Sequence, residues 1–268
     1  HIRRGVMQRA KMRWWPLHFA RLALLGTCCV AGGVSMGIAA HASEPPVLTV
    51  DGERFRDLNR NNRLDPYEDW RLPAERRADD LVKRMTLDEK AGAMMHGTLP
   101  GSGGVAIGVS AQGYDLEATR TLIAEKKITS FITRLNLPAH EFAEQNNAVQ
   151  DIAAGTRLGI PATISTDPRN HFEYVLGASA EVGAFSQWPD PLGFGALRDP
   201  AVTRRFADIA RQEYRAVGIH QALSPQADLA TEPRWSRQAG TFGSSAELVS
   251  PLVQAYVAGF QNGETGLM

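Results

Sequence analysis

Short apolar segments alternate with long helical segments over the second half of the sequence. The segments 128–133 and 160–164 are brief, rich in β-branched residues and bounded by Gly or Pro, whereas 139–154 and 200–217 have helical patterns. A short apolar run without polar alternation is typical of a strand that is buried on both faces, as in parallel sheets joined by crossover helices. The alternation therefore predicts an α/β fold with a parallel sheet. Periodicity alone does not separate an open sheet from a barrel.

Polar side chains follow these predicted strands directly. The first strand ends at Arg134 and the second at Asp167, and a third is expected from Ile219, with 226–229 at its end. In α/β barrels the residues at the carboxyl ends of the strands line the active site, so Asp167 is a candidate functional acid. An Asp-Pro turn with a purely structural role accounts for Asp167 equally well when it is taken alone.

A second informative stretch lies at 232–243, just past the third strand. It contains Arg234, Trp235 and Arg237 close together. An indole ring offers a flat apolar face to a sugar, and a guanidinium group donates hydrogen bonds to hydroxyls at fixed angles. These residues therefore suit carbohydrate recognition. The structural alternative is an Arg–Trp stack that holds the loop, and we expect one of the two arginines to have such a role.

The first 42 residues have the pattern of a secretory signal peptide. They begin with five arginines, one lysine and no acid, continue with the small and apolar segment 22–40, and end in Ala40-His41-Ala42, an A-x-A cleavage pattern. We therefore expect an exported protein, periplasmic or secreted, with no membrane contact beyond the export signal. A membrane anchor and a lipoprotein signal are less favoured alternatives. Cys28 and Cys29 both lie inside the signal, so the mature chain is expected to have no disulfide and no cysteine nucleophile.

A polar extension is expected at 43–72, ahead of the main body at 73–268. Its segment 57–68 matches the EF-hand loop pattern, with Asp57 at position 1, Asp65 at position 9 and Glu68 at position 12. Two interpretations stay open: a calcium loop, or an Asn/Asp-rich turn that ties the extension to the body. The body is expected to start with a helix at 73–85 and a second one behind a capping box at Thr86 and Glu89.

Composition excludes several classes of protein. The formal net charge is 0 and the sequence pI is about 7.2, so no general attraction to nucleic acid is implied. No G-x-G-x-x-G or Walker loop follows any predicted strand, and no nucleotide or other cofactor is expected. We assign no metal site.

Two runs resemble the sequences of glycoside hydrolase family 3. The first is Arg-Leu-Gly-Ile-Pro…Thr-Asp-Pro-Arg-Asn-His at 157–171, and the second is Glu-Pro-Arg-Trp-Ser-Arg…Thr-Phe-Gly at 232–243. The segments 57–70 and 85–90 also resemble the start of bacterial members. The resemblance covers about residues 50–268 and implies a (β/α)8 TIM-like barrel. In this chain the barrel is expected to be partial, lacking its later strands and the family's second α/β domain.

The resemblance also implies roles for individual residues. Asp167 corresponds to the family's glycone-binding aspartate, Arg237 corresponds to a second glycone-binding residue, and Arg134 is a weaker candidate for the pocket wall. The chain departs from the family pattern at Ser236, where Gly is usual, and at Ser244 and Ser245, where acids are usual. These departures concern the conformation of the loop rather than the identity of the arginine.

The expected function is therefore the N-terminal part of an exported, exo-acting, β-glucosidase-like glycosidase with a retaining mechanism. Such a mechanism needs two carboxyl groups about 5 Å apart. The resemblance implies that the nucleophile and the acid/base lie beyond residue 268, so no catalytic residue is assigned here, and the fragment alone is expected to be inactive. The expected partner is a β-linked oligosaccharide or glycoside. Alternatives are β-xylosidase or β-N-acetylhexosaminidase specificity on the same fold, or a non-catalytic carbohydrate- or calcium-binding protein.

Overall fold

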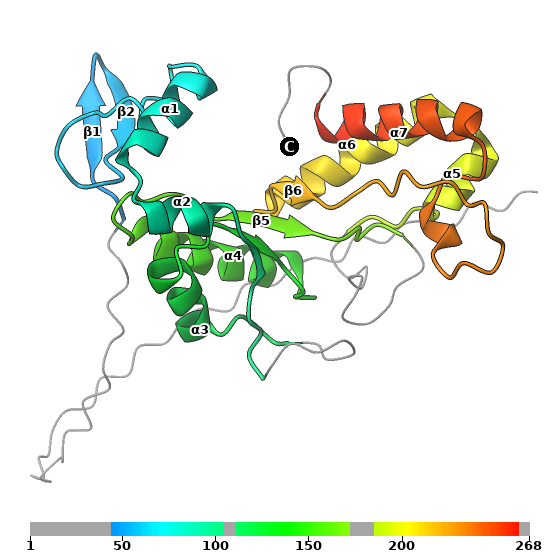
Figure 1. Cartoon of the computed structure of the whole chain (residues 1–268), viewed down its shortest axis with the longest axis horizontal. Helices are drawn as coiled ribbons and strands as arrows, with labels where there is room; N and C mark the ends of the chain where they lie inside the picture. The colour runs from blue at the N-terminus through cyan, green and yellow to red at the C-terminus, as the bar shows by residue number, and fades with distance from the viewer. Residues whose placement is uncertain (1–43, 104–110, 172–184, 263–268) are drawn as a thin grey trace, which may run out of the picture. The chain divides into compact units, whose positions relative to one another are not determined.

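The computed structural model describes residues 44–103, 111–171 and 185–262 (Figure 1). The predicted signal peptide at 1–42 lies outside the described residues. Over the described part of the chain, no helix combines the length and the apolar character that crossing a membrane requires.

The elements follow one another in the order that Figure 1 shows. The strands are β1 (Val47–Val50), β2 (Glu53–Arg56), β3 (His96–Thr98), β4 (Ser130–Ile132), β5 (Thr163–Thr166) and β6 (Gln221–Ala222). The helices are α1 (Ala74–Arg84), α2 (Leu87–Ala93), α3 (Leu116–Arg120), α4 (Ala139–Ala154), α5 (Pro191–Leu197), α6 (Pro200–Ala216) and α7 (Ala246–Phe260), with a π-helical turn η1 (Thr121–Glu125) and a 3-10 turn η2 (Gln238–Gly240).

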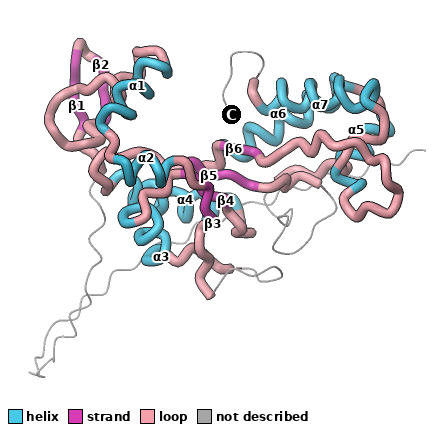
Figure 2. The backbone as a smooth tube through the Cα atoms, in the orientation of Figure 1, coloured by secondary structure: helices cyan, strands magenta, loops and turns pink. Residues whose placement is uncertain are grey.

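The main sheet is parallel and takes its strands in chain order, β3-β4-β5-β6 (Figure 2). Ile132 pairs with Ser165, and Thr166 pairs with Ala222, so the carboxyl ends of three neighbouring strands lie at one edge. Helix α4 connects β4 to β5, and α5 and α6 connect β5 to β6. Successive parallel strands joined by helices are the repeat of a β/α barrel. Within the described residues the sheet does not close, so the predicted partial TIM-like barrel is confirmed.

Side chains cap the starts of α2, α6 and α7, and the predicted capping box at Thr86 and Glu89 is confirmed. At the start of α2, Thr86 Oγ1 accepts from the Glu89 N–H at 3.2 Å, and the Glu89 carboxylate accepts from the Thr86 N–H at 2.8 Å. Asp199 caps α6, and Ser245 caps α7. Each cap satisfies backbone donors that the first turn of a helix leaves free.

Strand positions differ from the sequence expectation in three places. The second predicted strand, 160–164, forms at Thr163–Thr166 instead. The reason is that Gln150 of α4 takes both backbone groups of Ala162, through Oε1 at 3.0 Å and Nε2 at 2.8 Å, and so keeps that residue out of the ladder. The third strand ends at Ala222, so 226–229 lie beyond it and not at its end. Strand β3 is an additional strand that the sequence pattern does not predict, because His96–Thr98 contains no apolar run.

The core joins the sheet to α4, α6 and α7. Phe131 of β4 and Ile164 of β5 are fully buried in one apolar cluster with side chains of these helices. Helices α6 and α7 pack closely at Gly259, which has no side chain. A Cβ at this position would lie 2.5 Å from the Ala207 Cβ and from the Arg204 carbonyl oxygen. Phe206 packs against Tyr256 at a ring distance of 5.7 Å. The apolar burial fixes the helices that carry the strand-end loops.

The EF-hand-like segment 57–68 is held by its own backbone and by α1. Glu68 Oε1 accepts from the Leu58 N–H at 2.8 Å, and Arg84 Nη1 and Nη2 donate to the Asp65 carboxylate at 2.9 and 3.0 Å. The Tyr67 hydroxyl donates to the Leu158 carbonyl at 3.2 Å, which joins the extension to the body. These contacts are the ones that a structural turn predicts.

An ion pair links α2 to the segment ahead of β5, and its removal gives a first testable prediction. Arg157 Nε donates to Glu89 Oε1 at 3.0 Å, and its Nη2 also bonds the Glu89 carboxylate. Hydrogen bonds from Arg157 lower the pKa of Glu89. The Arg157 side chain is 53% exposed, so solvent screens the pair, and we expect Glu89→Gln to cost about 1 kcal/mol of unfolding free energy at pH 7.

The pH dependence of that difference follows from the sign of the shift. Because the folded pKa of Glu89 is lowered, the stabilisation is complete above the ordinary carboxyl pKa of about 4.3 and is lost as the pH falls through the folded value. Urea unfolding of wild type and Glu89→Gln across pH 3–7 measures it. Glu117→Gln, at a side chain that is 84% exposed, is the control. Equal stabilities of wild type and Glu89→Gln at pH 7 would contradict the assignment.

Candidate functional site

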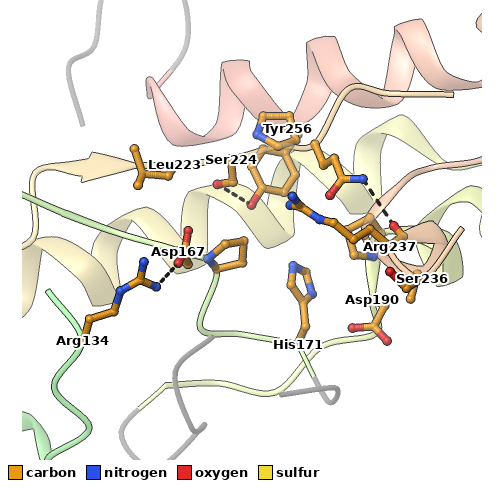
Figure 3. Close-up of a pocket in the computed structure, with 15 residues that line it drawn as sticks. Arg134, Asp167, His171, Asp190, Leu223, Ser224, Ser236, Arg237 and Tyr256 are labelled. Carbon is orange, nitrogen blue, oxygen red and sulfur yellow. Dashed lines mark hydrogen bonds and ion pairs between the residues drawn. The ribbon is translucent and has the colours of Figure 1, made fainter. Parts of the chain in front are cut away.

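A pocket opens at the carboxyl ends of β4, β5 and β6. It has a volume of about 630 Å³, within the range of roughly 300–1,000 Å³ that is usual for small-molecule sites. Figure 3 shows the residues that line it. They come from the strand-end loops, the start of α5, the loop around η2 and helix α7: Arg134, Asp167, Pro168, His171, Asp190, Pro191, Leu223, Ser224, Pro225, Gln226, Ser236, Arg237, Ala239, Gly240 and Tyr256.

Two of the predicted site residues are in direct contact. Arg134 follows β4 and Asp167 follows β5, and a guanidinium nitrogen of Arg134 donates to Asp167 Oδ2 (Figure 3). Both side chains are 31% exposed, so the pair belongs to the pocket wall and not to the core. The ion pair orients the Asp167 carboxylate, and its remaining lone pairs stay available to a hydroxyl donor.

The buried Arg169 fixes the positions of both strand-end loops. Its Nε donates to Thr166 Oγ1 at 2.6 Å and its Nη1 donates to the Leu135 carbonyl at 2.8 Å. These two acceptors are the chain neighbours of Asp167 and Arg134. The guanidinium also lies 4.8 Å from the ring centroid of Phe142. Arg169 therefore holds the ion pair in place from below without lining the pocket itself.

The two arginines of the 232–243 loop have different environments. Arg234 Nε donates to Glu232 Oε1 at 2.8 Å, and Arg234 does not line the pocket. Arg237 lines it, and no hydrogen bond or ion pair joins its guanidinium to another side chain of the described ranges (Figure 3). The expected structural role thus falls to Arg234, through Glu232 and not through a stack on Trp235. Trp235 is not among the lining residues.

Sequence reasoning did not single out His171 and Asp190 as site residues. His171 is the last residue of the Thr-Asp-Pro-Arg-Asn-His run that contains Asp167, and Asp190 is the N-cap residue directly before helix α5. The signal that would have found His171 is its place four residues after Asp167, past the end of the same strand. Burial lowers the pKa of the His171 imidazole. The pocket thus has a charged side at Arg134 and Asp167 and a second polar side at His171, Asp190 and Arg237.

Within the three described ranges, no group of three or more His, Cys, Asp or Glu side chains is arranged to hold a metal ion. In the 57–68 segment, the Asp57 carboxylate accepts from the N–H groups of Asn61 and Asn62 at 3.0 and 2.8 Å. Its oxygens therefore accept hydrogen bonds from the backbone of the turn and stabilise it.

Parallel strands in chain order, with a polar pocket at their carboxyl ends, define the class of β/α-barrel enzymes. The model of the glycosyl hydrolase family 3 N-terminal domain matches residues 86–267. The chain therefore belongs to glycoside hydrolase family 3, and the matched region is the N-terminal domain of that family.

Individual relatives agree with this assignment. The chain is 59% identical over 224 residues to a periplasmic β-glucosidase/β-xylosidase of Dickeya chrysanthemi. The alignment covers 83% of this chain and 34% of the relative. It is 44% identical over 222 residues to a protein named probable β-glucosidase C of Aspergillus oryzae, with 80% of this chain and 33% of the relative covered. The chain thus spans about a third of the length of both relatives.

A solved structure shows the same fold. A glycoside hydrolase family 3 β-N-acetylglucosaminidase from Paenibacillus sp. superimposes with a TM-score of 0.54 at 26% sequence identity. The superposition covers 66% of this chain and 31% of that protein.

Proposed function

We propose that this chain is the N-terminal part of an exported, exo-acting β-glycosidase of the β-glucosidase type. Its pocket holds the terminal sugar of a β-linked substrate. The observation that carries the proposal is the pocket at the strand ends, where the carboxylate of Asp167, oriented by Arg134, and the guanidinium of Arg237 line one cavity in a family 3 domain. A carboxylate accepts hydrogen bonds from hydroxyls and a guanidinium donates them, so together they satisfy adjacent hydroxyls of a sugar.

The chemical step requires further residues. We propose a retaining, two-step hydrolysis in which the nucleophile and the acid/base are carboxylates beyond residue 268. In this division of labour Asp167, Arg134 and Arg237 bind and orient the glycone, and the contribution of this segment to the rate is positioning. Export is supported by the signal-peptide pattern at 1–42 and by the word periplasmic in the name of the Dickeya relative.

A β-xylosidase activity is the second candidate, because the name of the Dickeya relative includes both activities. The sugars differ by the C5 hydroxymethyl group, so the walls of the pocket around the terminal sugar decide between them. A β-N-acetylhexosaminidase remains an alternative of the same fold.

Hydrolysis of aryl glycosides by the purified full-length protein tests the proposal. We expect release of the aryl group from aryl β-glucosides or β-xylosides, with retention of the anomeric configuration by proton NMR, and release of single sugars from the non-reducing end of oligosaccharides. Residues 43–268 produced alone are expected to be inactive on all these substrates. Failure of the full-length protein on the whole panel would refute the proposal, and activity of residues 43–268 alone would refute the placing of the catalytic carboxylates.

A further inference from the structure

One buried polar atom at the wall of the pocket has no partner. His171 lines the pocket and is 8% exposed, and its Nε2 is a buried atom without a hydrogen-bond partner among the described residues. A buried polar group without a partner is destabilising, so such an atom in a folded protein calls for an explanation. Figure 3 shows the ring directed from its backbone into the space between Asp167 and Arg237.

The other ring nitrogen fixes the tautomer. His171 Nδ1 lies 2.8 Å from the Pro189 carbonyl oxygen, which is only an acceptor, so Nδ1 carries the proton and donates it. In the neutral ring Nε2 is then an acceptor with a free lone pair. Burial lowers the pKa of the ring, which favours this neutral form at neutral pH. Nε2 of His171 can therefore be satisfied by a ligand group that donates a hydrogen bond.

We infer that Nε2 of His171 accepts a hydrogen bond from one hydroxyl of the bound sugar and so helps to determine which sugars the pocket accepts. The inference rests on the proposed function and adds a residue to the glycone site. Asp167 is an acceptor and Arg237 a donor, and His171 adds an acceptor that is uncharged.

The consequence is discrimination between hydroxyls and groups that cannot donate. A site that is built to hydrogen-bond a hydroxyl rejects an analogue without it, because its own polar atom is then left unpaired. A sugar with hydrogen, fluorine or a methoxy group at the position facing His171 is therefore expected to bind more weakly. Analogues changed at a hydroxyl that faces other residues leave this contact intact.

Two substitutions separate the two nitrogens. The amide nitrogen of Asn occupies the place of Nδ1, so His171→Asn keeps the bond to Pro189 and removes the acceptor. The amide of Gln reaches the place of Nε2, so His171→Gln keeps an acceptor and loses the bond to Pro189. The measurement is the inhibition constant of glucose or xylose, whichever inhibits the full-length wild type more strongly, together with the corresponding deoxy sugars and the melting temperature of each variant.

We expect His171→Asn to weaken inhibition by the parent sugar about tenfold or more, and His171→Gln to weaken it less. One deoxy sugar should inhibit wild type and His171→Asn equally, because the contact is already missing. An unchanged inhibition constant of the parent sugar in His171→Asn would overturn the inference. So would a weakening of inhibition by His171→Asn that is equal for all the deoxy sugars, or a larger weakening in His171→Gln than in His171→Asn. Absence of both hydrolysis and inhibition in the wild type would instead refute the proposed function.

Discussion

In the full-length enzyme, Asp167→Asn is expected to lower kcat/KM by about 10²–10⁴-fold, which corresponds to roughly 3–6 kcal/mol of transition-state stabilisation. The amide keeps the size of the side chain but loses the charge that attracts Arg134. It also presents an NH₂ group where sugar hydroxyls find an acceptor. Hydrogen bonds to sugar hydroxyls strengthen in the transition state of glycoside hydrolysis, so kcat falls together with the affinity.

Steady-state kinetics on an aryl β-glucoside measures the loss. Asp228→Asn is a matched control, because Asp228 is an exposed acid on the loop that follows β6 and does not line the pocket. We expect the control to stay within a factor of two of the wild type. An Asp167→Asn variant within a factor of three of the wild type would refute a role in binding the glycone.

The second large effect is expected at Arg169, which lies beneath the pocket. Arg169→Met should lower the unfolding free energy by about 2–4 kcal/mol, since Thr166 Oγ1 and the Leu135 carbonyl would lose their donor in a buried environment. Burial lowers the pKa of Arg169 to about 10, so the guanidinium remains charged at pH 7 and part of the gain offsets its desolvation. Methionine keeps most of the volume and can still pack against Phe142.

Thermal melting of the full-length protein tests this prediction. At roughly 2–4 °C per kcal/mol for a domain of this size, the transition should fall by about 4–16 °C. Arg234→Met is the control, because that side chain is 90% exposed and, among the described residues, is paired only with Glu232; a change within about 0.5 kcal/mol is expected. A melting temperature for Arg169→Met equal to that of the control would show that the buried guanidinium does not hold the strand ends.

The sequence was informative where local chemistry and topology agree. Helices α4 and α6 were predicted within a residue or two because helical periodicity and helix-boundary residues are local signals. Arg134 and Asp167 were each placed at the end of a strand from the sequence, and parallel strands bring their carboxyl ends to one edge; the ion pair between them was not predicted and comes from the structure. The roles of Asp167, Arg134 and Arg237 in sugar binding stay predictions until they are tested.

Strand β3, the start of β5 and part of the pocket depend on contacts between distant residues, which the sequence pattern does not show. Strand β3 has only three residues, His-Gly-Thr, without a β-branched run, and it becomes a strand because β4 pairs with it. The start of β5 is set by Gln150 of α4, which lies twelve residues before Ala162 and binds its backbone. His171 and Asp190 line the same pocket as Asp167, and periodicity does not predict that residues so far apart in the chain share one cavity.

The central claim is that Asp167 holds the sugar and does not attack it. When the nucleophile of a retaining glycosidase is truncated, a small anion can take its place, so added azide restores turnover and gives a glycosyl azide of inverted configuration. The direct measurement is therefore the product formed by full-length Asp167→Ala from an aryl β-glucoside in azide. We predict no α-glucosyl azide and no recovery of rate; formation of α-glucosyl azide would contradict the assignment and make Asp167 the nucleophile.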